Sequence, residues 1–181
     1  MKNKILPILI ASIIVFFSNA LHAQSETKSG LGYGFQLNQY QNDFGLGVNF
    51  SSPNFFSESV CLRLRANAMF HEYINDEFKT DWEPYANIML GFSSASYKIN
   101  DAIALYGEGG VIGIFPSSTI SSSDLEIGGY GVFGFEFYFY DGFCYFLEAG
   151  AIGIDAAADK LTTEPIYSNG FLMSVGLKVK L

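Results

Sequence analysis

The sequence has little with which to bind nucleic acid or metal. Only 10 of its 181 residues are Lys or Arg, against 18 Asp or Glu, and the basic residues form no cluster. Because proteins that bind nucleic acid carry a basic face or stripe, we expect no nucleic-acid partner. The two histidines, His22 and His71, are too few for a site with several histidine ligands. We therefore expect neither a metal nor a cofactor.

Long hydrophobic runs are also missing after residue 23, where no 18 consecutive residues are apolar. The first 23 residues have a different pattern. Lys2 and Lys4 precede an apolar core over residues 5–17, and residues 20–23 form a small-x-small cleavage site. This pattern is typical of a signal peptide and predicts export with cleavage after residue 23. A retained membrane helix is the alternative, but the apolar run is short for one.

The predicted mature chain, residues 24–181, is of a size that fits a single domain. Loss of two lysines with the signal moves its formal charge from -8 to about -10. Such acidic chains are usually soluble, yet aromatic residues make up 17% of this one and its mean hydropathy is +0.22. A hydrophobic exported chain without a membrane helix favours an outer-membrane β-barrel.

Apolar and small or polar residues alternate along most of the chain, and this period of two predicts β-strands. The pattern is clearest near the C-terminus, where Phe171, Met173 and Val175 alternate with small residues. The eight segments that show it are residues 31–37, 44–50, 60–70, 85–97, 102–115, 127–140, 143–154 and 170–181. Strands of roughly 9 to 13 residues can cross a bilayer when tilted. The predicted fold class is therefore all-β, an eight-stranded antiparallel up-and-down transmembrane β-barrel.

The lengths of the connections support this topology. Turns at 100–101 and 141–142 are short and fall at even positions, whereas the long segments 71–84, 116–126 and 155–169 fall at odd positions. Outer-membrane barrels have short periplasmic turns and longer external loops in this order. Segment 51–59 is long for a periplasmic turn.

A soluble lipocalin-like barrel is the rival all-β interpretation, and its apolar face would point inward around a ligand. Here the polar face is mostly Gly, Ser, Asn and Ala, which suits a narrow interior better than a water-exposed surface. We therefore expect an apolar exterior, with Leu62, Phe135 and Val175 facing lipid and Arg63, Glu136 and Ser174 facing inward. Two aromatic girdles are also expected. Their members are Tyr97, Phe139, Tyr140, Phe143 and Tyr145 on the periplasmic side and Phe70, Tyr73, Trp82, Tyr85 and Phe171 on the outer side.

The signal peptide, the eight alternating strands and a final strand that runs through residues 171–181 resemble the small OmpA/OmpX-type outer-membrane barrels. The resemblance is one of pattern and covers nearly all of the mature chain. It implies a protein of the Gram-negative outer membrane that contacts membrane lipid and acts as a monomer. It also implies that the barrel-insertion machinery reads the final strand, which in that family typically ends in an aromatic residue and here ends in Leu181.

Six charged residues fall on the polar side of predicted strands, close to the periplasmic end. They are Arg63, Arg65, Glu108, Glu136, Glu148 and Lys178. Strand counting predicts that they lie in one layer of the lumen. An ion pathway or gate is the functional interpretation. We favour a structural plug, because buried charges must be paired and an eight-stranded barrel has room only for its own side chains.

The only two cysteines, Cys61 and Cys144, fall on the third and seventh predicted strands. These strands lie across the barrel from one another, beyond the reach of a disulfide. We expect two buried thiols.

The external segment 71–83 mixes acidic and aromatic residues. Its candidate interaction residues are His71, Tyr73, Phe78 and Trp82. This composition suits contact with an extracellular protein or glycan. A hydrated loop anchored by interfacial aromatics is the alternative.

Catalysis has little support in the sequence, and no catalytic residues are predicted. A lipid acyltransferase or deacylase could place His71 with an acidic residue and the serines of segment 116–126 at the outer rim. Nothing in the spacing selects this arrangement, since a lone histidine in a polar loop is usually solvated. The predicted function is a plugged outer-membrane barrel with a structural or surface-interaction role. The alternatives are a lipid-modifying enzyme and a soluble ligand-binding barrel.

Overall fold

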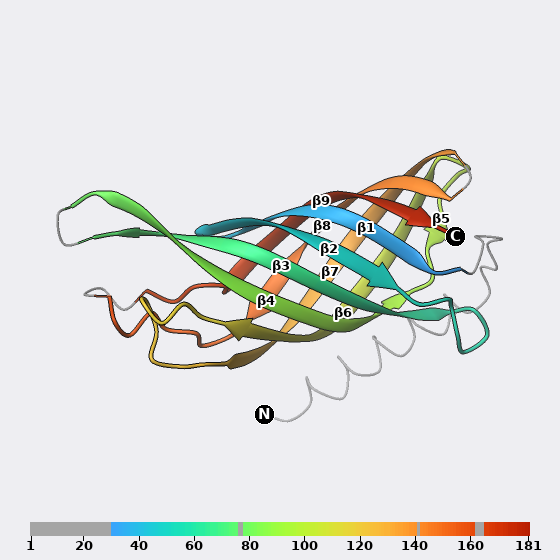
Figure 1. Ribbon diagram of the computed structural model, residues 1–181. Coiled ribbons are helices and arrows are strands. Elements are labelled where there is room, and N and C mark those ends of the chain that lie inside the picture. Colours follow the sequence, from blue (N-terminus) through green and yellow to red (C-terminus); the bar gives the residue numbers. More distant parts are fainter. Residues whose placement is uncertain (1–29, 76–77, 141, 162–164) are drawn as a thin grey trace, which may run out of the picture.

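Eight long antiparallel strands form a closed barrel in the computed structural model, which describes residues 30–75, 78–140, 142–161 and 165–181 (Figure 1). The long strands are β1 (Gly32–Tyr40), β2 (Asp43–Ser51), β3 (Val60–Ile74), β4 (Thr80–Ser94), β6 (Ile103–Phe115), β7 (Glu126–Tyr140), β8 (Phe143–Gly153) and β9 (Gly170–Lys180). The predicted signal peptide, residues 1–23, lies outside the described residues.

Each long strand pairs with its neighbours in the chain, and the first strand pairs with the last. β1 pairs with β9 from Gly32 opposite Lys180 to Tyr40 opposite Leu172. The β4–β6 ladder completes the ring of strands. The predicted eight-stranded up-and-down barrel is confirmed.

One predicted strand is divided in two. Residues 85–97 do not form a single strand, because β4 ends at Ser94 and the two-residue β5 (Tyr97–Lys98) follows it. β5 pairs with the first residues of β6, where Ala104 lies opposite Lys98. β5 therefore continues the barrel wall along the edge of β6 that β4 covers further on.

The barrel has two unlike ends. At the terminal end β1 begins and β9 finishes, and the chain crosses between strands at 52–59 and 99–102 (Figure 1). At the loop end the connections are 41–42, 75–79, 116–125 and 154–169. The two longest connections, 116–125 and 154–169, are both at the loop end, as predicted.

The β3–β4 hairpin reaches well beyond the rest of the barrel at the loop end (Figure 1). The prediction of a loop over 71–84 was wrong, because pairing continues to Ile74 opposite Thr80. Residues 71–74 and 80–83 therefore form a two-stranded ribbon. Pro84 is tolerated there because β4 pairs with β6 only from Ala86 onward, so the missing N–H of Pro84 breaks no ladder on that side.

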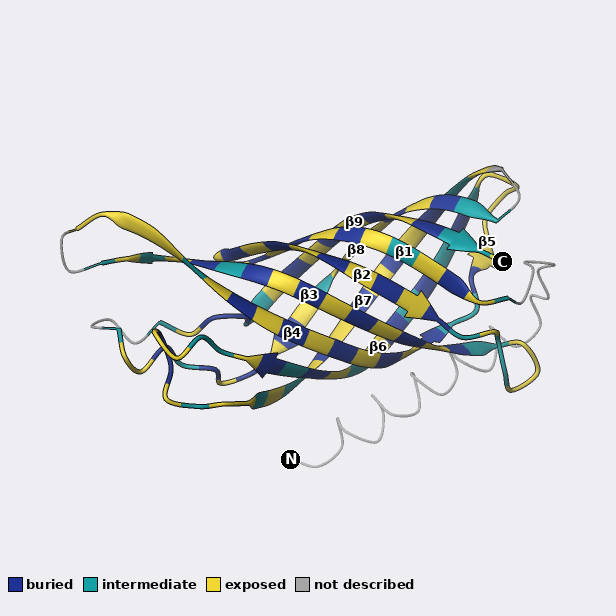
Figure 2. Ribbon diagram, in the orientation of Figure 1, coloured by how far each residue is buried: buried dark blue, intermediate teal, exposed yellow. Residues whose placement is uncertain are grey.

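Side chains alternate strictly between the outer face and the lumen (Figure 2). Leu62, Phe135 and Val175 are 37%, 36% and 48% exposed. Their neighbours Arg63, Glu136 and Ser174 are buried at 3%, 0% and 1%. The predicted orientation is thus the observed one, and the lipocalin-like interpretation, which needs the apolar face inside, is contradicted.

Small residues on the lumen side make room for large ones. A Cβ added at Gly134 would overlap the ring of Tyr106, and one added at Gly176 would overlap the ring of Phe146. The lumen is therefore filled by side chains from facing strands, as in other barrels of this size.

Within the described residues, no helix is long and apolar enough to cross a membrane.

Candidate functional site: the lumen and the loop end

A cluster of buried ion pairs lies in the lumen near the terminal end. Arg65 binds Glu108 through two hydrogen bonds, Nε to Oε1 at 3.0 Å and Nη2 to Oε2 at 2.7 Å. Its Nη1 lies 2.5 Å from Glu148 Oε2. Arg63 Nη1 bridges the same two carboxylates, at 2.7 Å from Glu108 and 2.8 Å from Glu148. The hydroxyl of Tyr130 also donates to Glu108 at 2.7 Å. β3, β6, β7 and β8 are joined through this cluster.

A second cluster lies next to it, around Glu136 of β7. The carboxylate of Glu136 binds the ammonium group of Lys178, and the hydroxyl of Ser96 donates to it at 2.6 Å. Lys180 Nζ lies 3.8 Å from the same carboxylate, and the Tyr138 hydroxyl donates to it as well. This cluster joins β7 to β9 and to the segment that precedes β5.

The ring of Tyr106 lies between the two clusters. The Arg63 guanidinium carbon is 4.8 Å from the ring centroid, and Lys178 Nζ is 5.3 Å from it. The tyrosine hydroxyl also donates to Glu148. The structure therefore brings the six predicted lumen residues together as two adjacent groups rather than as one layer. Lys180, Tyr106, Tyr130 and Ser96 were not predicted, although Lys180 and Tyr106 share the inward parity of Lys178 and Glu108.

A layer of amides follows toward the loop end. Asn67 Oδ1 accepts hydrogen bonds from Gln36 at 2.8 Å and from Asn38 at 2.9 Å, and Asn67 Nδ2 donates to Asn87 at 2.7 Å. Ser174 donates to Asn38 at 2.7 Å, which closes the network across β9 and β1. These residues are buried, and their polar groups need such partners away from water.

The next layer is apolar and includes residues from two loops. Met69, Met89, Ile112 and Leu172 are almost wholly buried within the barrel. The loops at 116–125 and 154–169 add residues of their own, namely Ile120, Ala156, Ala158 and Tyr167, all at most 1% exposed. The two loops thus close the lumen at the loop end.

Asp43 forms a buried polar latch in this half of the barrel, together with three residues from other elements. His71 Nδ1 lies 2.5 Å from Asp43 Oδ1. Asp43 Oδ2 accepts from the Tyr85 hydroxyl at 2.9 Å and from the backbone N–H of Ser168 at 2.7 Å. The Ser168 hydroxyl is bonded to the Tyr85 hydroxyl. We call these four residues the Asp43 latch, which ties the 154–169 loop to β2, β3 and β4.

Two sequence-based expectations are corrected by the Asp43 latch. His71 is 1% exposed and faces the lumen, so it is neither a rim residue nor part of an external interaction site. Tyr85 is 5% exposed and does not belong to an outer girdle. At Asp43 and His71 the period-two alternation runs one residue beyond the predicted strands 44–50 and 60–70, because internal partners compensate for burying a polar group.

The structure gives the enzyme alternative no working arrangement among the residues that it describes. His71 Nε2 has no hydrogen-bond partner there, and no serine hydroxyl is bonded to it. The nearby loop serines have other partners. Ser122 binds Asp159 through its hydroxyl and its backbone N–H, and Ser117 binds Glu83. The hydrogen bonds from Ser122 lower the pKa of Asp159 below its usual value.

The remaining predicted interaction residues lie on the β3–β4 hairpin, and they differ in position. Trp82 faces outward close to the barrel wall, where its ring meets that of Phe44 edge-on at 5.0 Å. Tyr73 is half-buried on the ribbon. Phe78 is 92% exposed at the tip. All three residues lie on the β3–β4 hairpin, and Phe78 is the one at its exposed tip.

No model of a known protein family matches the chain, and no curated protein matches it in sequence. Among solved structures, the barrel is similar to the crystal structure of Ail, the attachment invasion locus protein of Yersinia pestis. The TM-score is 0.47 at 10% identity, covering 84% of this chain and 97% of that chain. A structure of Ail in complex with the heparin analogue sucrose octasulfate gives a TM-score of 0.43 at 13% identity, covering 83% and 95%. The NanC porin gives 0.34 at 9% identity, covering 87% and 75%. The predicted relation to OmpA/OmpX-type barrels stays a prediction.

Both cysteines lie on the lumen side near the terminal end. Cys61 on β3 and Cys144 on β8 are buried, and their thiols are free.

Within the described part of the chain, no group of three or more His, Cys, Asp or Glu residues is placed to hold a metal ion.

Proposed function

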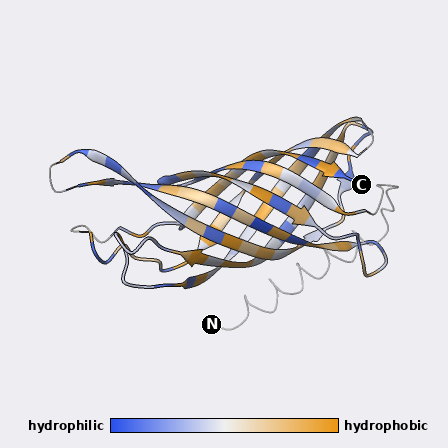
Figure 3. Cartoon of the chain, viewed as in Figure 1, coloured by the Kyte–Doolittle hydropathy of each residue, from blue (hydrophilic) through white to orange (hydrophobic). Residues whose placement is uncertain are grey.

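We propose that the protein is a monomeric outer-membrane β-barrel whose filled lumen is structural and whose loop end contacts partners outside the cell. The observation that carries this proposal is a band of apolar side chains on the outer face. Hydrophobic residues recur along the strands (Figure 3), and they coincide with the exposed positions of Figure 2. Each long strand has a large apolar side chain that is at least 41% exposed. These side chains are Leu37, Leu46, Leu64, Leu90, Val111, Phe133, Leu147 and Val175. A continuous band of this kind is unfavourable in water and suits the hydrocarbon core of a bilayer.

Aromatic side chains at both ends of the band support the membrane assignment. At the loop end the ring of Phe44 packs on Phe70 at 5.2 Å and meets Trp82. At the terminal end the ring of Tyr145 packs against Phe139 at 4.9 Å and Phe143 at 5.8 Å. Aromatic girdles lie at the two interfaces of membrane barrels. In this orientation the loop end faces the exterior and the terminal end faces the periplasm.

The packing of the lumen favours a structural role over conduction or catalysis. Ion pairs fill the half near the periplasm, and the apolar layer together with two loops closes the other half. Each buried charge is held by partners on other strands, so an ion pathway would require several ion pairs to break at once. The plug interpretation of the lumen charges is the one that we propose.

The exposed part of the loop end is acidic and carries an apolar tip. Glu72, Asp81, Asp124, Asp155 and Asp159 are exposed. In the described part of the loop end, Lys79 and Lys160 are the lysines that accompany them. Complementary charge steers association and selects partners. The favoured partner is therefore a basic protein surface that also receives the aromatic tip at Phe78, rather than a sulfated glycan.

The membrane assignment is tested by fractionation and electrophoresis. The protein should separate with outer membranes, resist extraction with carbonate and migrate faster on gels before boiling than after. In planar bilayers the purified protein should give no conductance steps. Recovery in the periplasmic fraction would contradict the membrane proposal, and steady conductance would contradict the filled lumen.

The partner proposal is tested with the barrel in nanodiscs of neutral lipid, presented to immobilised polylysine and immobilised heparin. We expect salt-sensitive binding to polylysine and none to heparin. A triple variant with Glu72→Gln, Asp81→Asn and Glu83→Gln should bind polylysine more weakly, whereas Glu58→Gln at the terminal end should not. Preference for heparin would overturn the choice of a basic partner and leave the barrel assignment intact.

A further inference from the structure

The lumen at the terminal end contains more positive than negative side chains. Four cations face one another there, namely Arg63, Arg65, Lys178 and Lys180, and the carboxylates that accompany them are Glu108, Glu136 and Glu148. Among these side chains, the cations exceed the carboxylates by one. A buried charge that is not matched needs a counter-ion or solvent.

Lys180 is the most weakly paired of these four cations. Its ammonium group lies 3.8 Å from a carboxylate that Lys178 already binds more closely. The side chain of Lys180 is 18% exposed, and it stands nearest the mouth of the barrel. The excess charge is thus located at the entrance and not in the depth of the lumen.

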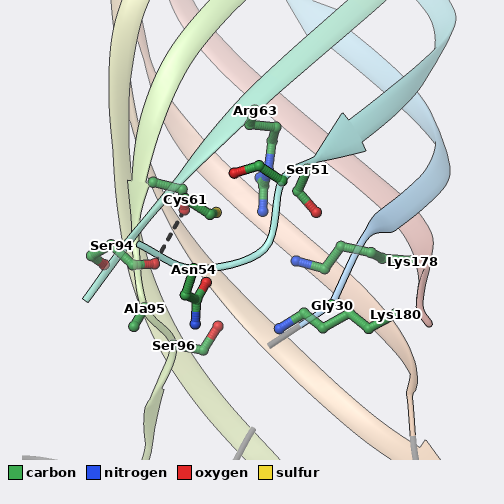
Figure 4. Close-up of a pocket in the computed structure, with 12 residues that line it drawn as sticks. Gly30, Ser51, Asn54, Cys61, Arg63, Ser94, Ala95, Ser96, Lys178 and Lys180 are labelled. Atoms are coloured by element: carbon green, nitrogen blue, oxygen red, sulfur yellow. Dashed lines mark hydrogen bonds between the residues drawn. The ribbon is translucent and has the colours of Figure 1, made fainter. Parts of the chain in front are cut away.

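A small cavity lies at this place, with a volume of about 20 Å³. Arg63, Lys178 and Lys180 line it together with serine hydroxyls, and no carboxylate is among the lining residues. Figure 4 shows the ammonium ends of Lys178 and Lys180 pointing into the same space, beside Ser51 and below Arg63. The lining is therefore suited to a negative charge.

Arg63 supplies an independent observation. Its side chain is 4% exposed and its Nη1 contacts two glutamates, but its Nε–H has no hydrogen-bond partner in the described part of the chain. A buried donor without an acceptor is rare and costly. Arg63 lines the cavity, so an acceptor bound there would be close to this group.

The geometry points to a site for one small monovalent anion, of which chloride is the representative, at the periplasmic mouth of the barrel. The anion must be small, because the cavity of about 20 Å³ is little larger than the roughly 10–15 Å³ that a single water needs. Its charge follows from the one unmatched cation. Sulfate and the phosphate dianion would carry more charge than the one excess cation. The anion would join Lys180 of β9 to Arg63 of β3 and so brace the end of the barrel that the loops do not close.

The site is tested first on the unaltered protein. Crystals of the detergent-solubilised barrel soaked in sodium bromide should show an anomalous peak between Lys178, Lys180 and Arg63. Absence of bromide from this cavity, at full occupancy of other surface sites, would overturn the proposal. A peak only at exposed lysines such as Lys98 would show an adventitious ion and would also overturn it.

The second test compares thermal unfolding in non-ionic detergent at constant ionic strength, in sodium chloride and in sodium isethionate. Chloride should raise the midpoint, because a ligand that binds only the folded state stabilises it. Lys180→Gln should lose the chloride-dependent part of the shift, Lys180→Arg should retain it, and the matched control Lys98→Gln should behave as the unaltered protein. An equal midpoint in sodium isethionate, or a full shift in Lys180→Gln, would indicate a general salt effect and refute the site.

Discussion

In the half of the lumen near the terminal end, arginines, lysines and glutamates connect facing strands, whereas in the other half aliphatic and aromatic side chains do so. The two halves are built on the same strands and have the same alternation. Charged groups need particular partners at hydrogen-bond distance, and apolar groups need only to fill the space. The charged half should therefore be sensitive to the loss of one partner, and the apolar half to the loss of volume.

Arg65→Met should give the largest effect, because it leaves Glu108 and Glu148 buried with only Arg63 between them. Removal of one partner from a buried ion pair costs about 3–5 kcal/mol. The measurement is the free energy of unfolding in urea, with the barrel in lipid vesicles.

The control for this prediction restores the charge balance. The double variant with Arg65→Met and Glu148→Met keeps the Arg63–Glu108 pair and should recover much of the lost free energy. Equal stability of Arg65→Met and the unaltered protein would refute the view that these pairs form a structural plug.

Leu172→Ala should be the next largest change. Leu172 is wholly buried in the apolar half, so its truncation leaves a cavity that costs about 2–5 kcal/mol. The matched control is Leu177→Ala on the same strand, where the side chain faces outward and is 36% exposed. Urea unfolding should show a clear loss for the first variant and a smaller one for the second. A larger loss for Leu177→Ala than for Leu172→Ala would contradict the assignment of the apolar core to the lumen.

Asp43→Ala should have a moderate effect that is concentrated at the loop end. It removes the acceptor for His71, Tyr85 and the backbone of Ser168, and each unsatisfied buried group costs about 1–3 kcal/mol. The 154–169 loop should loosen, so trypsin should cleave after Lys160 more rapidly.

Cleavage after Lys79, on the β3–β4 hairpin, is the internal control for the Asp43 variant and should keep its rate. An unchanged rate after Lys160 would show that other contacts hold the loop. Asp43→Asn keeps one acceptor oxygen. Its rate of cleavage after Lys160 should lie between those of the unaltered protein and of Asp43→Ala.

Ser122→Ala should give the smallest effect. The hydrogen bonds from Ser122 depress the pKa of Asp159, so their stabilising contribution is present above the unfolded-state pKa and is lost as the pH falls through the lower, folded-state pKa. Removing the hydroxyl should move the pKa of Asp159 back toward its ordinary value, as measured by carboxyl NMR titration. Ser123→Ala is the control and should leave the titration unchanged. The change in global stability should be small for Ser122→Ala, because Asp159 is exposed and its interactions are screened by solvent.

The alternation of residues allowed the barrel and the direction of its faces to be predicted, because a period of two assigns every residue of a strand to one side. It placed Arg63 and Glu108 in the lumen, and their pairing followed from charge. It did not predict the Asp43 latch, whose members come from β2, β3, β4 and the 154–169 loop, since no local pattern encodes contacts between four segments. The ribbon of residues 71–74 and 80–83 was also missed, because its polar residues are equally typical of a loop.

The ladder between β1 and β9 differs from every other ladder of the barrel in one respect. Each of the others joins strands that are close in the chain, with only the two-residue β5 between β4 and β6, whereas this one joins residues about 140 positions apart, such as Gln36 and Gly176. Neighbouring strands can pair before the rest of the chain is in place, but the ring cannot close until β9 is complete. Until that moment both β1 and β8 expose an unpaired edge, the feature that makes strands associate wrongly. Exported copies therefore need protection until their last eleven-residue strand is in place.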